Sequence, residues 1–330
     1  MLKQMGAQFD LSIIIVNWNS AAFVRQCLSS IYENSITVEF EIIVVDNGSG
    51  DGCREMIEEE FPAVRFVESR ENLGFAGANN LGFNYASGRN VLFLNPDTEV
   101  AGQAIERMVR FLDSTSDAGI AGGRLLNADR SIQTRCIQRF PSILNRAVDA
   151  EFLRWLFPKA RLWGTRPLVE NPAVTVSVDV VTGACLMMPR GVFEKVGLFT
   201  TDYFMYAEDV DLCFKVRHGG WKNYYVGEAV FVHYGGQSSN LRPEKHFAEV
   251  AMREAWRKFF SRYYGRNRAI VYQVTTGLVA LFRIGLLAGL LLVTVGRLRR
   301  ELLLGTLGKW ILIFRWSIGL KCWASTLGPK

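Results

Sequence analysis

The sequence predicts an α/β fold built on a mostly parallel central sheet. Two features of its first half lead to this prediction: short runs of β-branched residues, typical of strands buried on both faces, and helical patterns between them. Strands that alternate with helices of this length form βαβ units, whose strands are parallel. The expected strands are Leu11–Val16, Glu41–Val45, Val64–Val67 and Asn90–Leu94, and the expected helices are Ala21–Tyr32, Gly52–Glu60, Phe75–Ala86 and Gln103–Leu112. Such sheets bind ligands at the carboxyl ends of their strands, so the functional residues are expected there.

The second half is less regular. Residues 127–173 contain four prolines and no clear pattern, which indicates a long excursion from the sheet. Pattern returns at Asp179–Met188, at a helix beginning near Glu208, at a strand over Ala229–Val232 and at a helix over Glu244–Tyr264, before two apolar segments, Ala269–Gly296 and Leu302–Leu327. We therefore predict an α/β domain over residues 1–240, divided near residue 125, and a helical C-terminal region over residues 241–330.

Composition excludes several classes of protein. A hydrophobic content of 49% and a charged content of 21% are those of a globular chain of 330 residues. The six cysteines form no CxxC pair, which argues against a disulfide framework or a structural zinc site and favours a reducing cytosol. The apolar run Leu11–Val16 is too short for a signal peptide, so none is expected. No nucleic-acid-binding motif is present, so nucleic acid is not an expected partner.

Positive charge is concentrated at the C-terminal end of the chain. The net charge is +6, but from Arg266 onward ten Lys and Arg accompany a single acid, Glu301. The remainder of the chain is therefore slightly acidic. A basic, aromatic and apolar tail points to an anionic membrane surface.

Polar residues follow the first two predicted strands. Strand 1 leads into Val16, Asn17 and Asn19, and strand 2 ends at Asp46 in the sequence DNGSGDG. A carboxylate at a strand end can accept hydrogen bonds from a nucleotide base or a ribose hydroxyl. The plainer interpretation is turn chemistry and a helix cap.

A glycine-rich segment, ENLGFAGANN, opens the third predicted helix. Its glycines allow a close backbone approach to a ligand, and a helix N-terminus favours phosphate. Asn79 and Asn80 are poor helix formers, which suggests that their side chains face a ligand. The alternative is a glycine-rich turn with a frayed helix start.

The fourth predicted strand ends in Asn95-Pro96-Asp97. A carboxylate just past a buried strand is well placed to hold a divalent cation that bridges two phosphates, although an Asx turn would explain it equally. His233 follows a later strand and is one of three histidines in the chain. A single histidine is more often structural than a metal ligand.

Three acids, Glu208, Asp209 and Asp211, open the predicted helix near residue 208. Acids at a helix start and bases at its end match the helix macrodipole, which is one explanation. Three acids exceed what capping needs, however, and they follow an aromatic, apolar run. Such a setting raises the pKa of a carboxylate and suits a general base.

Together these segments resemble glycosyltransferase family 2, especially its bacterial rhamnosyltransferase-like members. The resemblance spans residues 11–238 and rests on seven motifs in one order: IIIVNWNS, IIVVDNGSGDG, ENLGFAGANN, LFLNPD, VTGACLMMPR, FMYAEDVDLC and VFVHYGG. It implies a GT-A fold, with residues 1–125 as its nucleotide-sugar half and residues 126–240 as its acceptor half.

The resemblance also implies roles for residues. Asp209 corresponds to the catalytic base, Asp46 to the residue that contacts the base of the nucleotide, and Asp97 with His233 to the ligands of Mg²⁺ or Mn²⁺. Asn95 stands where many relatives have the first Asp of a DxD motif, which leaves one anionic ligand at the metal. The motif residues expected at the donor are Val16, Asn17, Asn19, Asp46, Asn72, Gly74, Phe75, Ala76, Asn79 and Asn95, and those expected on the acceptor side are Gly183, Ala184 and Glu208.

The implied reaction is a single displacement that inverts the anomeric carbon, since one carboxylate suffices to take the proton of the acceptor hydroxyl. The resemblance suggests dTDP-rhamnose as donor and a lipid-linked saccharide as acceptor, with UDP-sugars as the alternative donors. A nucleotidyltransferase would place a basic, glycine-rich loop after strand 1, and a processive synthase would carry a QxxRW signature; both are absent. A catalytically inactive nucleotide-sugar-binding module remains the non-enzymatic alternative.

The apolar tail predicts peripheral or monotopic attachment to the cytoplasmic face of the inner membrane. Residues 269–296 would span about 42 Å as a helix, enough for a bilayer core of about 30 Å. Arg283 lies in the middle, however, and would cost about 2.5–3.5 kcal/mol there, so two interfacial helices are preferred. Interfacial anchors recur in the second segment: Lys309, Trp310, Arg315, Trp316, Lys321 and Trp323. Packing on the catalytic domain, or on a second subunit in a homo-oligomer, is the alternative.

Overall fold

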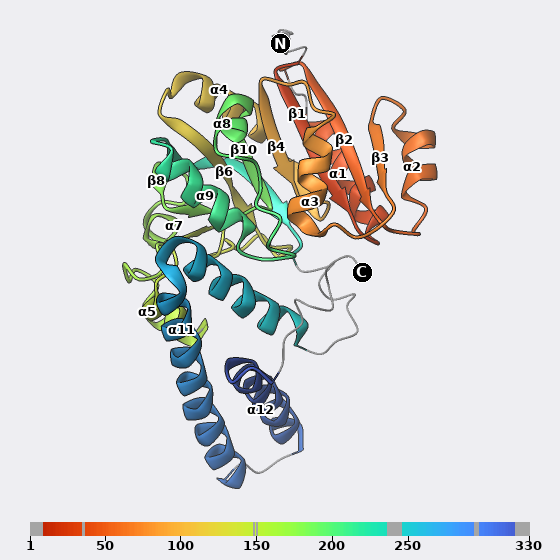
Figure 1. Cartoon of the computed structure of the whole chain (residues 1–330). Coiled ribbons are helices and arrows are strands. Elements are labelled where there is room, and N and C mark those ends of the chain that lie inside the picture. Colours follow the sequence, from red (N-terminus) through yellow and green to blue (C-terminus); the bar gives the residue numbers. More distant parts are fainter. Residues whose placement is uncertain are drawn as a thin grey trace.

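A nine-stranded sheet forms the centre of the molecule (Figure 1). The computed structural model describes residues 9–34, 37–147, 149, 151–235, 246–293 and 297–320. The strand order is β3-β2-β1-β4-β10-β6-β11-β5, and β8 also pairs with β11. The strands are β1 Leu11–Asn17, β2 Phe40–Asn47, β3 Arg65–Ser69, β4 Asn90–Leu94, β5 Thr98–Ala101, β6 Ala118–Leu126, β8 Thr175–Val178, β10 Cys185–Pro189 and β11 Lys222–His233.

The predicted α/β class and mostly parallel sheet are confirmed. Strands β3, β2, β1 and β4 are parallel neighbours, and β6 and β11 run in the same direction as these four. Strand β10 lies antiparallel between β4 and β6, and β5 and β8 are antiparallel to β11. The continuous apolar runs predicted as strands are buried on both faces, since residues 13–15 and 43–45 are fully covered.

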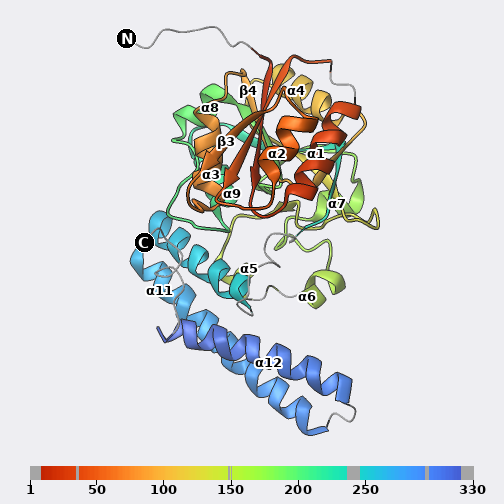
Figure 2. The same ribbon diagram turned by 90° about the vertical axis from the view of Figure 1, so that its right-hand side faces the viewer.

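Helices cover both faces of the sheet. Figure 2 shows α1 (Ala21–Glu33), α2 (Cys53–Glu60) and α4 (Ala104–Ser114) on one side, and α3 (Gly74–Phe83), α8 (Arg190–Lys195) and α9 (Glu208–His218) on the other. An aromatic cluster joins the second layer to the sheet: Phe83, Phe93, Phe193 and Phe199 have ring centroids 4.8–5.4 Å apart. Such contacts between rings add to the free energy of burial.

Strand β6 was not predicted because its sequence, AGIAGGRLL, resembles a loop. Its glycines serve packing instead. A Cβ at Gly122 would lie 2.6 Å from Val181 Cβ, and a Cβ at Gly123 would lie 2.5 Å from the Phe231 ring. Glycine in a strand often marks such a close approach. The four-residue strand β5, directly after the Asp97 turn, was also missed.

The predicted excursion over residues 127–173 is confirmed. It contains only short elements: β7 Ile137–Gln138, α5 Ile143–Ala147, α6 Glu151–Leu156 and α7 Arg166–Glu170. Strand β7 pairs with β9 (Val180–Val181) in a separate two-stranded sheet. The excursion thus lies beside the carboxyl ends of the main strands, where it contributes to the site described below.

Two long helices form the C-terminal region. Helix α11 (Phe247–Val293) changes direction at Gly265, where φ is 83° and ψ is 166°, and α12 (Arg297–Ser317) runs antiparallel to its second part. Gln273 Nε2 donates to Ser317 O at 3.0 Å, and the Arg283 guanidinium lies 4.3 Å from the Trp310 ring centroid. This helical hairpin extends away from the sheet in both views of the ribbon.

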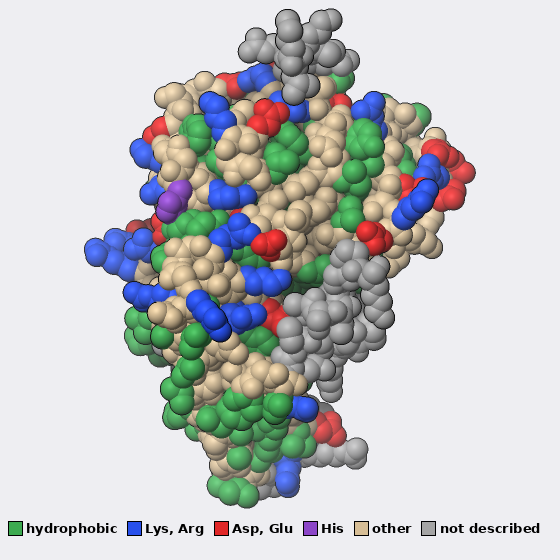
Figure 3. All heavy atoms as spheres, viewed as in Figure 1, with side chains coloured by type: hydrophobic (Ala, Val, Ile, Leu, Met, Phe, Trp, Pro, Cys, Tyr) green, Lys and Arg blue, Asp and Glu red, His purple; other side chains and the backbone are tan. Residues whose placement is uncertain are grey.

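The outer surface of the hairpin is apolar. Phe282 and Leu292 are 72% and 89% exposed, and the segment Ala248–Val293 contains a window of mean hydropathy 2.2 that is long enough to cross a membrane. Figure 3 shows hydrophobic side chains gathered at this end of the molecule. The domain boundary at residues 240–241 stays a prediction. Gly236, Ser238, Glu244, Gly296, Lys321, Trp323 and Leu327, on which parts of the sequence interpretation fell, lie outside the described residues.

Gly82 permits the close contact between α3 and the sheet. A Cβ there would lie 2.7 Å from Ile14 Cγ2 and 2.9 Å from Val45 Cγ2, both on buried strands. Gly82→Val should therefore destabilise the protein by about 1–3 kcal/mol through overpacking, measured as a lower midpoint of thermal unfolding. Gly191→Ala in α8 is the matched control, because a Cβ there has no heavy atom within 4 Å. An unchanged midpoint for Gly82→Val would contradict this packing.

Candidate active site

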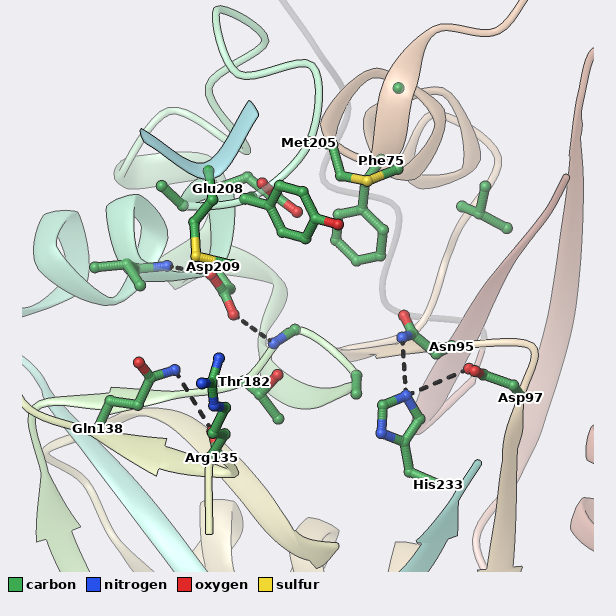
Figure 4. A pocket seen from close by; sticks show the side chains of 18 of the residues that line it. Phe75, Asn95, Asp97, Arg135, Gln138, Thr182, Met205, Glu208, Asp209 and His233 are labelled. Atoms are coloured by element: carbon green, nitrogen blue, oxygen red, sulfur yellow. Dashed lines mark hydrogen bonds and ion pairs between the residues drawn. The ribbon is translucent and has the colours of Figure 1, made fainter. Parts of the chain in front are cut away.

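A cavity of about 470 Å³ lies at the carboxyl ends of β1 and β4 and the amino end of β10, between the sheet and the N-terminus of α9 (Figure 4). Most of the predicted site residues line it. They come from six separate segments of the chain: Val16, Asn72, Gly74, Phe75, Asn95, Asp97, Gly183, Ala184, Glu208, Asp209 and His233. The structure thus brings together the expected metal, base and acceptor-side residues, whose roles stay predictions.

One side of the cavity carries Asp97 and His233. His233 Nε2 lies 3.4 Å from Asp97 Oδ1 and 3.4 Å from Asn95 Nδ2. Pairing of β11 with β5 sets this geometry, because His233 is opposite Thr98, the residue after Asp97. Tyr234 N also donates to Asp97 O at 2.9 Å. Both side chains are largely buried.

Gln133 orients the imidazole, and sequence reasoning missed it. Its Nε2 donates to His233 O at 2.5 Å, so its Oε1 faces His233 Nδ1 at 2.9 Å. An amide oxygen can only accept, so Nδ1 carries a proton, and Nε2 is the ring nitrogen that faces Asp97. Nothing near Gln133 in the sequence marked it, since it contacts His233 across 100 positions.

This pair fits a divalent cation held by few protein ligands. An imidazole nitrogen whose second nitrogen is fixed by hydrogen bonding, beside a carboxylate, is a common ligand arrangement. The described residues contain no cluster of three or more His, Cys, Asp or Glu able to hold a metal. A cation here would therefore need further oxygen ligands from water or from a bound phosphate.

The first two strand ends form a hydrogen-bonded network beside the cavity. Asn17 Nδ2 donates to Asp46 Oδ1 at 2.8 Å and lies 3.2 Å from both carboxylate oxygens of Asp51. Asn19 N donates to Ser49 Oγ at 2.9 Å, with Asn19 at a positive φ of 51°. Asn17, Asn19 and Asp46 do not line the cavity. Their neighbour Asn47 does, and its amide nitrogen lies 3.1 Å from Asn72 Oδ1.

The two asparagines of α3 are not brought to the cavity. Asn79 is buried and its Nδ2 donates to Phe75 O within the same helix at 2.9 Å. Asn80 instead exchanges two hydrogen bonds with the backbone of Phe199. Ala76 is also buried away from the cavity. A hydrogen bond within the helix thus accounts for Asn79 and two tertiary hydrogen bonds account for Asn80, so a ligand is not needed to explain either residue.

Phe75 reaches the cavity because α3 begins on a tight contact. Gly74 has a φ of 73°, and a Cβ there would lie 2.4 Å from Phe204 O. Only glycine fits this position. The contact brings Phe75 beside the segment that carries Met205, as Figure 4 shows.

Asp209 lies across the cavity from the Asp97 and His233 pair (Figure 4). Its Oδ2 accepts a hydrogen bond from Gly183 N at 3.0 Å, and its Oδ1 accepts one from Val210 N at 2.8 Å. Tyr206 and Ala207, just before it, both have positive φ, of 70° and 67°. Such backbone strain in non-glycine residues is concentrated at functional sites. Burial raises the pKa of Asp209, and the two backbone N–H groups oppose this.

Glu208 and Asp211 differ from Asp209 in their hydrogen-bond partners and in their surroundings. Burial, and then the charge of Asp209, raises the pKa of Glu208 to about 8, and its Oε2 has no hydrogen-bond partner among the described residues. Asp211 is fully buried away from the cavity and accepts hydrogen bonds from Thr200, Tyr203 and Tyr263 at 2.6–3.1 Å. The third acid thus anchors α9 against α11.

The excursion and α11 supply lining residues that the sequence did not single out. They are Arg135, Gln138, Arg146, Asp149, Met252 and Trp256. The available signal was the density of arginine in a proline-rich segment, with Arg135, Arg139, Arg146 and Arg154 within 20 residues. Arg135, Arg146 and Trp256 make this side of the cavity cationic and aromatic.

The fold is that of a GT-A glycosyltransferase, and comparison with known proteins agrees. The sequence model described as "Glycosyl transferase family 2" matches residues 12–197, more than half of the chain. The chain therefore belongs to glycosyltransferase family 2, as its motifs predict.

Several relatives carry specific names. The chain is 30% identical over 227 residues to the low-salt glycan biosynthesis hexosyltransferase Agl10 of Haloferax volcanii, covering 68% of this chain and 66% of that protein. It is 27% identical over 252 residues to the N-acetylglucosaminyl-diphospho-decaprenol L-rhamnosyltransferase of Mycobacterium tuberculosis, covering 72% of this chain and 80% of that enzyme. It is 24% identical over 268 residues to the rhamnosyltransferase WbbL of Escherichia coli, covering 78% and 94%.

A solved structure shares the fold. It is the mannosyltransferase PcManGT from Pyrobaculum calidifontis in complex with GDP-Man and Mn²⁺, with a TM-score of 0.57 at 18% identity, covering 97% of this chain and 85% of that one. The protein is thus a glycosyltransferase, and its C-terminal apolar helix is consistent with membrane association.

The buried carboxyl of Glu208 should make stability depend on pH. Its pKa rises from 4.5 in the unfolded chain to about 8 in the folded protein, so the folded state binds the proton more tightly. This contribution is fully present below pH 4.5 and is lost as the pH rises through about 8. Glu208→Gln should therefore have a free energy of unfolding at pH 8.5 that exceeds the parent's by a few kcal/mol at most, measured as a higher midpoint of thermal unfolding. This gain should shrink toward pH 5. A gain that does not vary with pH would rule out this ionisation.

Proposed function

We propose that the protein is a metal-dependent, inverting transferase that moves one rhamnose from dTDP-rhamnose to a lipid-linked saccharide in cell-surface polysaccharide synthesis. The observation that carries this proposal is the arrangement of one cavity, with the Asp97 and His233 pair on one side and the buried Asp209 on the other. In an inverting transfer, the negative charge of the leaving diphosphate must be stabilised on one side of the sugar, and the proton of the attacking hydroxyl must be accepted on the other.

The donor diphosphate would lie beside Asp97 and His233. A divalent cation bound there supplies charge stabilisation for the leaving diphosphate. Gln133 and Asn95 keep the His233 ring directed toward Asp97, which preorganises the site before the donor arrives. Asn47, Asn72 and Phe75 line the donor side of the cavity and would hold the nucleotide and sugar.

Asp209 would act as the base. The carboxylate takes the proton of the acceptor hydroxyl as the oxygen forms its bond to the anomeric carbon, while the bond from that carbon to the diphosphate oxygen breaks. One displacement inverts the configuration. Glu208 with a pKa of about 8 keeps its proton at neutral pH, so Asp209 is the carboxylate of this adjacent pair available to accept one.

The relatives support the choice of donor and acceptor. Two of them are named rhamnosyltransferases, and the mycobacterial name includes a sugar attached to diphospho-decaprenol. A lipid-linked acceptor also agrees with the apolar helical hairpin. We place the hairpin at the cytoplasmic face of the inner membrane, because nucleotide sugars are made in the cytoplasm and because Arg283, which would be costly in a spanning helix, is turned inward onto Trp310.

Replacing the base should abolish turnover without removing donor binding. Asp209→Asn keeps the shape of the side chain and one of its two backbone hydrogen bonds, because an amide nitrogen cannot accept, and kcat should fall about 10²-fold or more. The measurement is single-turnover sugar transfer, together with dTDP binding by calorimetry. Glu208→Gln is the matched comparison and should retain most activity. If Asp209→Asn turns over normally and Glu208→Gln does not, the base is Glu208.

Removing either proposed metal ligand should weaken metal-dependent nucleotide binding. Asp97→Ala and His233→Ala should lose most of the Mn²⁺-stimulated affinity for dTDP, and Gln133→Leu should lose about tenfold or more because the ring is no longer fixed. His218→Ala is the control, because His218 lies at the far end of α9 and stacks on Phe214. Full activity of the purified protein in excess EDTA would contradict the metal site.

A further inference from the structure

A second cavity, of about 300 Å³, opens beside the active-site cavity and leads away from the sheet. The two cavities share five lining residues: Arg135, Arg146, Asp149, Met252 and Trp256. The far side of the second cavity is formed by α11 and α12, through Arg253, Arg283, Lys309 and Trp310. The second cavity therefore lies between the active-site cavity, which Asp209 lines, and the helical hairpin.

Cationic side chains outnumber carboxylates in this second cavity. Arg146, Arg253, Arg283 and Lys309 line it together with Arg135, whereas the only carboxylates among its described lining residues are Asp149 and Glu249. Arg146 has a side chain only 8% exposed. Charges removed from water are costly unless they meet opposite charge, so an anion would offset the surplus positive charge of this lining.

Both carboxylates are already engaged. Asp149 accepts from Arg154 Nε at 2.7 Å and lies 3.9 Å from Arg146 Nη1. Glu249 pairs with Arg253 at 2.8 Å and with Lys309 at 3.7 Å. Arg283 has no carboxylate of the described chain within ion-pair distance. Its guanidinium lies 4.3 Å from the centroid of the Trp310 ring, which holds it at the cavity.

Beyond Arg283 the surface of α11 is apolar. A shallow groove of about 540 Å³ runs along α11 on both sides of this position, formed by Leu281, Phe282, Leu286 and Leu290 over Gly285 and Gly289. A Cβ at either glycine would meet no heavy atom within 4 Å, so the groove is open. The exposed apolar surface in Figure 3 lies at this end of the molecule. The order along the molecule is therefore the polar cavity, the cationic cavity and, on adjoining turns of α11, the apolar groove.

We propose that the cationic cavity binds the diphosphate of a polyprenyl-diphosphate-linked acceptor, with its saccharide at Asp209 and its prenyl chain along the α11 groove. The inference rests on the proposed transfer to a lipid-linked saccharide and identifies the residues that would recognise the lipid. Two adjacent phosphates match several guanidinium groups, each able to donate two parallel hydrogen bonds. It also gives Arg283 a function at the one interior position of the apolar segment where a charge would otherwise be costly.

Binding of the lipid can be measured without the donor or the reaction, so its outcome is independent of the transfer activity. Full-length protein is mixed with neutral phosphatidylcholine vesicles that contain a polyprenyl diphosphate, and bound protein is recovered by flotation. Arg283→Gln and Lys309→Gln should each weaken this binding about tenfold, the usual effect of losing one charged hydrogen-bond donor. Arg300→Gln is the control: it removes the same charge from exposed α12 surface outside the cavity and should leave the affinity unchanged.

Two further arms identify the source of the anion. Vesicles with phosphatidylglycerol at matched charge should bind more weakly than those with the polyprenyl diphosphate, and binding to them should not distinguish Arg283→Gln from Arg300→Gln. Equal loss for all three variants would mean a general attraction to anionic membranes and would overturn the site. Free pyrophosphate that competes as strongly as the lipid would overturn the lipid assignment. A matched thermal midpoint for Arg283→Gln confirms that it folds, and Arg283→Lys should recover part of the binding.

Discussion

The active site depends on strand β10 being inserted antiparallel between β4 and β6. This pairing puts Cys185 opposite Leu94, so Asn95 N donates to Ala184 O at 3.0 Å. The preceding residue, Gly183, donates its N–H to Asp209. A backbone connection of a few residues therefore links the side of the cavity that carries Asp97 to the side that carries Asp209, and it fixes their relation without relying on flexible side chains.

The same geometry imposes a cost in stability. Glu208 and Asp209 are buried next to each other, and burial raises the pKa of both carboxyls. Asp211 offsets part of this cost, because its hydroxyl partners Tyr203 and Tyr263 hold the start of α9 against α11. A helix that carries strained backbone and perturbed acids is stabilised by the acid that does not face the cavity. Such a division of roles, in which some acids face the cavity and a neighbouring acid stabilises the helix, is expected where function and stability compete.

The C-terminal hairpin is connected to the catalytic domain at the level of side chains. Trp256 on α11 lies under Arg146 of the excursion, with the guanidinium 4.9 Å from the ring centroid, and both line the active-site cavity. The excursion, which the sequence shows only as a proline-rich interruption, is thus one of the contacts between the two regions. Two of its arginines, Arg135 and Arg146, line both the candidate active-site cavity and the cavity that α11 and α12 border.

The sequence by itself determined the α/β class and the first four strands, and it singled out the main residues whose chemistry is proposed above. Buried strands need continuous apolar runs, and carboxylates at strand ends need no tertiary information to be recognised. Tertiary structure alone decided which of them meet. It turned Asn79 inward, assigned Asp211 to packing, and recruited Gln133 from 100 residues away. The physical reason is that a side chain's partner depends on sheet order and loop path, which local pattern does not encode.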